Sequence, residues 1–283
     1  MTTRTRAELS LLSITLIWGS TFVTSKYLLN TISPLIYIAA RFAVATLIFG
    51  AYFRNTIFKA PKSSWIKGGV LGILLFAGFA SQTIGLQYTG ASKSAFITGM
   101  MVVFTPLCQV LIERRAPKMG NIAGIILVTA GLYFLTSPNG SEFNLGDGLN
   151  LVCALTFGFY IVYLDVFSKD HDAVHLTMAQ FVVCTVLGFA SAPLFETIRF
   201  SPTAGGLLAL AYLIIFATII ALFVQNKFQK DTTPTRSAVI FSIEPVLAAG
   251  FAYIFMSEVL GWMGILGGAM IVGGVLVSEL SPA

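Results

Sequence analysis

Apolar segments of about twenty residues follow one another along almost the whole of this 283-residue chain. A helix needs about 20 apolar residues to cross the hydrocarbon core of a bilayer. Taking prolines, glycines and charge clusters as boundaries, we predict ten membrane spans. They cover residues 7–29, 34–53, 66–88, 94–112, 119–136, 147–167, 174–194, 204–226, 237–256 and 260–279. The segments between them are short and leave no room for a soluble domain.

The composition agrees with burial in lipid. Hydrophobic residues make up 56% of the chain and charged residues 10%, whereas an average soluble domain contains about 25% charged residues. So few charges cannot cover a water-facing surface, which excludes a soluble enzyme, a nucleic-acid-binding protein and a disordered chain. The apolar segments lack the alternation of barrel strands, so we predict an all-α membrane protein.

Basic residues are concentrated in alternate connecting segments. With a cytoplasmic N-terminus, the segments on that side hold 13 of the 17 lysine and arginine residues. These are Arg4, Arg6, Arg54, Lys59, Lys62, Lys67, Arg114, Arg115, Lys118, Lys169, Lys227, Lys230 and Arg236. Positively charged loops stay in the cytoplasm, and an even number of spans returns the chain to its starting side. Both termini are therefore expected to be cytoplasmic.

The chain resembles itself at half its length, in two registers. In the first register, an offset of 139, the pairs are Trp18-Gly19 with Phe157-Gly158 and Arg41-Phe42 with Gln180-Phe181. Pro106 and Pro245 also differ by 139 and so break the second register, but four residues are about one helical turn, which is compatible with both prolines marking the same face. In the second register, an offset of 143, the pairs are Gln82 with Gln225, Lys93-Ser94-Ala95 with Arg236-Ser237-Ala238, Gly124 with Gly267, and Ala130-Gly131 with Gly273-Gly274. Their order along the chain indicates a duplication, with a four-residue insertion before the eighth span.

We therefore predict two five-helix units, residues 1–139 and 140–283. Because five is an odd number, the second unit enters the membrane from the opposite side. This inverted-topology repeat is the architecture of many secondary transporters, whose solute site lies near the midplane between the halves. A duplicated membrane protein without a transport role is the alternative. Gly120-x-x-x-Gly124 and Gly264-x-x-x-Gly268 lie on equivalent spans, where small residues favour close packing within the fold or between copies.

Several segments of the chain resemble the drug/metabolite transporter (DMT) superfamily, in its EamA-domain branch. They are residues 16–22 (LIWGSTF), 40–42 (ARF), 94–98 (SAFIT) with 105–107 (TPL), and 234–238 (PTRSA) with 243–246 (IEPV). The resemblance covers nearly the whole chain as two tandem EamA-type units. It implies ten helices, cytoplasmic termini and proton-linked or facilitated exchange of a metabolite. Members of the family include exporters of amino acids and other metabolites, and some importers.

Two charged residues lie inside predicted spans, where a charge is costly unless it is paired, hydrated or protonated. Glu244 lies about seven residues into the ninth span. It is either a proton- or cation-coupling site or a structural carboxylate. Arg41 either binds an anionic group, pairs with a carboxylate or extends its side chain toward the membrane surface. Pro106 and Pro245 are expected to be helix hinges, since proline removes a backbone donor.

Aromatic and mildly polar residues form the predicted substrate-binding set. Trp18 and Thr21 share a helix face and align with Phe157 and Tyr160 in the repeat. The predicted set is Trp18, Thr21, Phe79, Gln82, Met100, Tyr160, Tyr163 and Gln225. Such a lining suits an amphipathic metabolite or an organic cation. The alternative is that these side chains pack helices together.

We expect a secondary transporter in a bacterial inner membrane that moves a small metabolite by alternating access, with export of amino acids or related amphipathic compounds favoured. The expected partners are the substrate, the lipid bilayer and, in one version, protons. No cofactor, metal or nucleic acid is expected. The alternatives are an importer or facilitator of a small organic cation, a passive channel, and a membrane-embedded enzyme. The sequence leaves substrate, direction, coupling ion and oligomeric state open.

Overall fold

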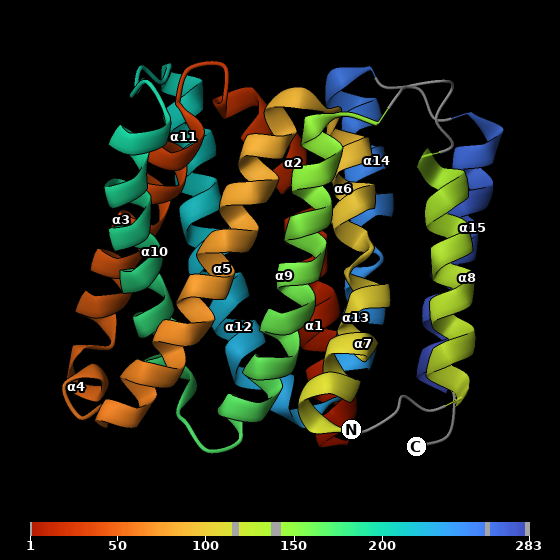
Figure 1. Ribbon diagram of the computed structural model, residues 1–283, viewed down its shortest axis with the longest axis horizontal. Helices are drawn as coiled ribbons and strands as arrows, with labels where there is room; N and C mark the ends of the chain where they lie inside the picture. The colour runs from red at the N-terminus through yellow and green to blue at the C-terminus, as the bar shows by residue number, and fades with distance from the viewer. Residues whose placement is uncertain (1, 115–118, 137–142, 258–260, 281–283) are drawn as a thin grey trace.

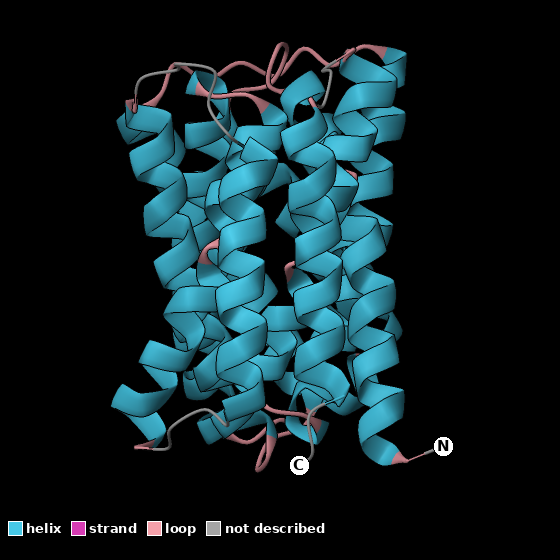
Figure 2. Ribbon diagram, turned by 90° about the vertical axis from the view of Figure 1, so that its right-hand side faces the viewer, coloured by secondary structure: helices cyan, strands magenta, loops and turns pink. Residues whose placement is uncertain are grey.

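The computed structural model describes residues 2–114, 119–136, 143–257 and 261–280, which form a bundle of helices running between two ends (Figures 1 and 2). Eight helices or runs of consecutive helices are long and apolar enough to cross a membrane, and two further apolar helices have shorter apolar stretches. We call the end at which the first helix begins the lower end, as drawn in Figure 1, and the opposite end the upper end. The all-helical class predicted from the sequence is found throughout the described residues.

The helices follow the predicted spans in order. In the first half they are α1 (Thr3–Gly19), α2 (Thr21–Leu28), α3 (Pro34–Tyr52), α4 (Arg54–Ile57), α5 (Lys62–Tyr88), α6 (Ala91–Gly99), α7 (Met101–Glu113) and α8 (Met119–Thr136). In the second half they are α9 (Leu145–Ser168), α10 (Ala173–Phe195), α11 (Ala204–Tyr212), the π-helix η1 (Leu213–Ile220), α12 (Ala221–Phe228), the 3-10 turn η2 (Gln229–Asp231), α13 (Pro234–Phe241), α14 (Glu244–Met256) and α15 (Trp262–Leu280). The predicted start of the tenth span at Leu260 and the predicted boundary between residues 139 and 140 lie outside the described residues.

Some helices begin earlier than the apolar pattern predicts because polar side chains cap them. The Thr2 side chain accepts a hydrogen bond from the amide of Thr5 at the start of α1. Asn144 and Asp147 form a reciprocal capping box at the start of α9. Each cap satisfies backbone donors that would otherwise lack partners. The helices therefore extend into sequence that is too polar to count as membrane-spanning.

Three of the predicted spans are broken near the middle of the bundle, where Figure 2 shows short interruptions of the helices. The breaks lie between α1 and α2, between α6 and α7, and between α13 and α14. Whether Pro106 and Pro245 act as hinges stays a prediction. Helix α7 continues through Pro106, and the break before α7 lies at Met100. Pro245 lies in the first turn of α14, where a missing amide donor costs little.

The fourth and ninth spans correspond in the second register of the repeat, the offset of 143. Helices α7 and α14 have bounds that differ by this number, and each is followed by a non-glycine residue in the left-handed region, Arg114 (φ 55°) and Ser257 (φ 56°). Pro106 and Pro245, which differ by 139, therefore occupy positions one helical turn apart rather than equivalent ones.

Close contacts at glycines repeat in the two halves. A Cβ on Gly19 would lie 2.4 Å from the Cβ of Leu247, and a Cβ on Gly158 would lie 3.1 Å from the Cβ of Phe104. The two glycines are equivalent in the first register of the repeat, and Phe104 and Leu247 in the second. The first helix of each half thus packs against the second segment of the broken helix from the other half.

Helices α8 and α15 pack side by side at one edge of the bundle (Figure 1). A Cβ on Gly124 would lie 2.8 Å from the carbonyl oxygen of Gly274, and a Cβ on Gly131 would lie 2.7 Å from that of Gly267. Both pairs of equivalent glycines therefore meet crosswise. These two contacts are seven residues apart along each helix, and one of them involves Gly124 of the predicted motif. Gly268 of the predicted motif makes only an ordinary contact, 3.6 Å from Val246.

Two buried ion pairs also obey the repeat. Lys93 at the upper end contacts Asp147 at 2.7 Å, and Arg236 at the lower end contacts Glu8 at 3.1 Å. The two acidic partners are equivalent in the first register of the repeat and the two basic partners in the second. Each pair joins one half of the chain to the other, and both pairs are present at the same time.

Candidate functional site

A small pocket, with a cavity volume of about 50 Å³, lies in the middle of the bundle. Eight of the residues singled out in the sequence line this pocket: Trp18, Thr21, Arg41, Phe79, Gln82, Tyr160, Gln225 and Glu244. They come from six spans and from both halves of the chain. Whether each of them binds a solute stays a prediction.

Two of the predicted substrate-binding residues are not part of the lining. Met100 occupies the break between α6 and α7, and its neighbour Met101 lines the pocket instead. Tyr163 lies about one turn beyond Tyr160 on α9, and its ring packs on Phe167 with centroids 5.5 Å apart. The pocket therefore ends near the level of Tyr160.

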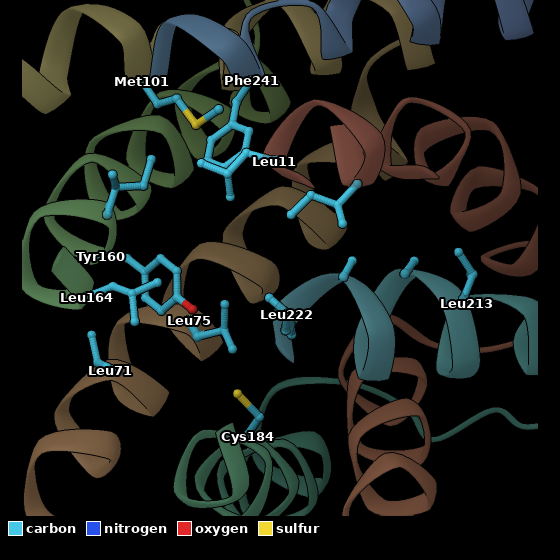
Figure 3. Packing of buried hydrophobic residues seen from close by; sticks show 14 of the residues in the cluster. Leu11, Leu71, Leu75, Met101, Tyr160, Leu164, Cys184, Leu213, Leu222 and Phe241 are labelled. Atoms are coloured by element: carbon cyan, nitrogen blue, oxygen red, sulfur yellow. The ribbon is translucent and has the colours of Figure 1, made fainter. Parts of the chain in front are cut away.

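Sequence reasoning missed several apolar members of the lining. They are Leu75, Met101, Phe157, Ile161, Leu222 and Phe241, together with the polar Thr98. Figure 3 shows Leu75, Tyr160, Leu222, Met101 and Phe241 directed toward one another from five different helices. Phe157 had already been aligned with Trp18 in the repeat, and this equivalence was the one available signal.

The three helix breaks converge on the pocket. Thr21, Met101 and Glu244 are the first residues of α2, α7 and α14, and all three line the pocket. Each break places the N-terminus of a half-helix, which is the positive end of its dipole, in the interior of the bundle. Discontinuous helices of this kind form the solute and ion sites of many transporters.

Glu244 combines a membrane-interior position with the start of a helix. Its carboxylate lies in the first turn of α14, where the helix dipole favours a negative charge. No lysine or arginine among the described residues lies within 4 Å of it. A carboxylate at this place has room to bind a positively charged group or a proton from the pocket.

Arg41 is held inside the bundle and does not extend to the membrane surface, since only 2% of it is exposed. Its guanidinium donates to the hydroxyl groups of Tyr37 and Thr218, and to the carbonyl of Ala217 at 3.3 Å. The cation also lies 5.0 Å from the ring centroid of Phe79. No carboxylate of the described residues lies within 4 Å.

The π-helix η1 supplies the acceptor that joins Arg41 to Trp18. The carbonyl of Ala217 accepts hydrogen bonds from Trp18 Nε1 at 3.1 Å and from Arg41 at 3.3 Å. The hydroxyl of Thr218 donates to the carbonyl of Leu213, five residues earlier, at 2.8 Å. Single turns of π-helix are frequent at functional sites. The sequence signal for this turn was Thr218, the sole polar residue between Leu213 and Ile220.

The glutamines that align in the repeat differ in their surroundings. Gln82 Nε2 donates to Thr98 Oγ1 at 3.2 Å, so this amide joins α5 to α6 at the pocket wall. Gln225 lies on α12 and is 3% exposed. Both nevertheless contribute to the pocket lining, one from each half.

Comparison with known proteins assigns this chain to a family. The profile of the EamA-like transporter family matches residues 5–137 and 144–280, once in each half. An uncharacterized transporter of Archaeoglobus fulgidus is 34% identical over 279 residues, which cover 98% of this chain and 87% of that protein. The uncharacterized inner membrane transporter YedA of Escherichia coli K12 is 24% identical over 243 residues, covering 84% of this chain and 79% of YedA.

A crystal structure with 20% sequence identity has the same fold. It superposes with a TM-score of 0.80 and covers 98% of this chain and 97% of its own. The family match and the names of the relatives indicate a transporter rather than an enzyme. This chain is a membrane-embedded transport protein made of two tandem repeats, and it belongs to the EamA-like transporter family.

Proposed function

We propose that this protein is a secondary transporter that binds a small zwitterionic metabolite, an α-amino acid or a related amphipathic compound, in the central pocket. One observation carries this proposal. The pocket at which three broken helices meet is lined by one guanidinium, Arg41, and one carboxylate, Glu244, and neither forms an ion pair with a described residue.

Charge complementarity between the pocket and its solute supports this proposal. A charge away from water is costly unless an opposite charge or hydrogen bonds compensate it. An amino acid supplies both opposite charges in one molecule: its carboxylate for Arg41 and its ammonium for Glu244. The rings of Trp18, Phe79 and Phe157 offer an apolar wall for its side chain. A polyanion is a poor fit, because Arg41 is the one cationic residue of the lining.

The proposal includes an orientation and a location. We place both termini in the cytoplasm of a bacterial cell, with the two halves inverted in the inner membrane. The concentration of 13 of the 17 basic residues in alternate connecting segments supports this orientation. The name of the relative YedA, an inner membrane transporter, supports the location. Export is the favoured direction, because the resembled family includes exporters of amino acids.

Glu244 is also the proposed coupling group. A carboxylate that binds a proton on one side of the membrane and an ammonium group on the other would link the two movements. In this proposal the proton and the solute bind to the same carboxylate, Glu244. The solute crosses the membrane by alternating access.

A second candidate function is transport of a small organic cation. It is favoured because the aromatic rings of Trp18 and Phe241 line the same pocket as Glu244. Aromatic faces bind quaternary and primary ammonium groups. In this version Arg41 has a structural role in holding η1.

Three related solutes distinguish these candidates. Purified protein in proteoliposomes is loaded with an amino acid, with its decarboxylated amine or with its N-acetyl derivative, and counterflow of the labelled solute is measured. We expect saturable counterflow of the amino acid alone. Binding is checked by the rise in thermal stability, since a ligand of the folded state stabilises by mass action. Preference for the amine would favour the cation candidate, and counterflow of none across a panel of amino acids would contradict the proposal.

A further inference from the structure

A chain of buried hydrogen bonds crosses three helices next to the pocket. The Tyr160 hydroxyl on α9 donates to Gln180 Oε1 on α10 at 2.9 Å. Gln180 Nε2 donates to Asn226 Oδ1 on α12 at 2.7 Å, and Asn226 Nδ2 donates to the carbonyl of Leu222 at 2.7 Å. Tyr160, Gln180 and Asn226 are each at most 1% exposed. Tyr160 is the only one of the three that lines the pocket.

This chain of bonds lies toward the lower end of the bundle, beside the lower part of the pocket, where Leu222 and Gln225 also form the lining. Gln180 is seven residues from the start of α10, about 10 Å from that end, and Asn226 is two residues from the end of α12, about 3 Å from it. The bonds therefore hold the lower parts of α9, α10 and α12 together at the lower part of the pocket wall.

The equivalent residues at the upper end are Thr21, Arg41 and Thr83. Thr21 and Arg41 match Tyr160 and Gln180 in the first register of the repeat, and Thr83 matches Asn226 in the second. They are not joined in the same way. Thr21 Oγ1 donates to the carbonyl of Trp18 in its own span at 2.8 Å, and the hydrogen bonds of Arg41 go to α3 and η1.

The two ion pairs that are equivalent in the repeat differ from this chain of hydrogen bonds. Lys93–Asp147 at the upper end and Glu8–Arg236 at the lower end are both formed. A contact that is present at both ends keeps the halves together in either state. A contact that is present at one end alone distinguishes the states.

We infer that Gln180 and Asn226 are positioning residues for transport: with Tyr160 they form a latch at the lower end, and Thr21, Arg41 and Thr83 form the equivalent latch when the lower one opens. This inference rests on the proposed function. In an inverted repeat the two states arise when the halves exchange conformations. Side-chain hydrogen bonds in membranes contribute about 1 kcal/mol each, so such a latch opens and closes at physiological temperature.

Distances between spin labels report whether each end of the bundle is open or closed. The three native cysteines, Cys108, Cys153 and Cys184, are buried and are replaced by serine or alanine. One label pair is attached at exposed positions Asp170 and Lys230 at the lower end. The other pair is attached at exposed positions Asn30 and Gln87 at the upper end. The labelled protein is measured in lipid nanodiscs without added solute.

Substitution of the middle residue tests the latch. Gln180→Met keeps the length of the side chain and removes its hydrogen bonds. We expect a longer lower distance and a shorter upper distance, with a change of about three- to tenfold in the ratio of the two populations. Thr83→Val should shift the ratio in the opposite direction. Unchanged distances in Gln180→Met, or both ends moving in the same sense, would overturn the latch.

A matched control and a second variant separate gating from loss of structure. Thr177 lies one turn from Gln180, is equally buried, and donates to the carbonyl of Ala173 in its own helix. Thr177→Val should leave both distances as in the wild type. If Gln180→Met does not fold, as judged by its thermal unfolding, Asn226→Leu is measured in its place with the same expected shift.

The failure of the latch and that of the proposed function are distinguishable. Opposite movement of the two label pairs without counterflow of any solute would support the latch and contradict the solute assignment. Counterflow of an amino acid in Gln180→Met at the wild-type rate, with unchanged distances, would support the solute assignment and overturn the latch.

Discussion

The two halves of the chain share their helix order and their close contacts, yet they carry different charges at equivalent positions. Arg41 in the second span is replaced by Gln180 in the seventh, and Glu244 in the ninth span is replaced by Met101 in the fourth. The backbone scaffold is thus nearly symmetric, whereas the lining of the pocket is not. A symmetric scaffold suits exchange between two states, and an asymmetric lining suits a solute whose two ends differ in charge.

The substitution Arg41→Gln has the largest expected effect. It gives the second span the residue found at the equivalent position of the seventh span, Gln180. In Arg41→Gln the pocket loses its one cation, and the dissociation constant for an amino acid should rise at least about 100-fold, as expected for truncation of a buried charge. The constant for the decarboxylated amine should change little. Isothermal titration of both ligands measures the difference. Arg54→Gln, at an exposed residue of the lower end, is the control. An equal loss for both ligands would contradict the assigned role of Arg41.

Neutralising Glu244 tests the contribution of the second half of the chain to solute binding. Glu244→Gln should weaken amino acid binding about tenfold or more, because the ammonium group loses its counter-charge. It should also make uptake into proteoliposomes independent of an imposed proton gradient, while counterflow without a gradient persists. Substitution of the amide in Gln225→Met, elsewhere in the same lining, should leave the response to the gradient intact. A response to the gradient that persists in Glu244→Gln would remove Glu244 from proton coupling.

The equivalent ion pairs should differ in their contribution to stability. Asp147 is fully buried and also caps α9, whereas Glu8 keeps 15% of its side chain exposed. Asp147→Asn should therefore lower the free energy of unfolding by about 2 kcal/mol, and Glu8→Gln by about 1 kcal/mol or less. Denaturation in detergent, followed by circular dichroism, compares the two variants. Equal losses would show that burial does not distinguish the pairs.

The smallest expected difference concerns the equivalent glycines. A Cβ on Gly19 would overlap Leu247 Cβ at 2.4 Å, whereas on Gly158 it would lie 3.1 Å from Phe104 Cβ. Gly19→Ala should cost about 1–3 kcal/mol through overpacking, and Gly158→Ala less. Thermal unfolding gives the order of the two variants. Gly69→Ala, where no atom would lie within 4 Å of the new methyl group, is the control.

Much of the fold follows from the sequence because lipid imposes a simple rule on helix length and polarity. That rule predicted the helices and their order, and the self-similarity of the chain predicted the tandem repeat. It did not predict the breaks at Ser20 and Met100, where neither proline nor a charge interrupts the apolar pattern. Neither proline coincides with the residue at which a span is broken. A proline at the start of a helix is tolerated, and α7 runs through Pro106.

The pocket was harder to predict than the fold. Residues that share a face by spacing, such as Trp18 and Thr21, were placed together correctly. The break at Met100 shifted the lining to Met101, and the level at which the pocket ends left Tyr163 outside. Helix rotation and depth depend on packing between spans, which the spacing within one span does not contain.

The crosswise pairing of glycines in α8 and α15 has a consequence for biogenesis. Gly124 contacts Gly274, so the contact joins two positions separated by more than half of the chain. During synthesis α8 is complete long before α15 exists, and its glycine face has no partner from this chain until translation is almost finished. We expect the first half to remain loosely assembled in the membrane until then, and a ribosome that stops before the last helix to release a protein prone to degradation.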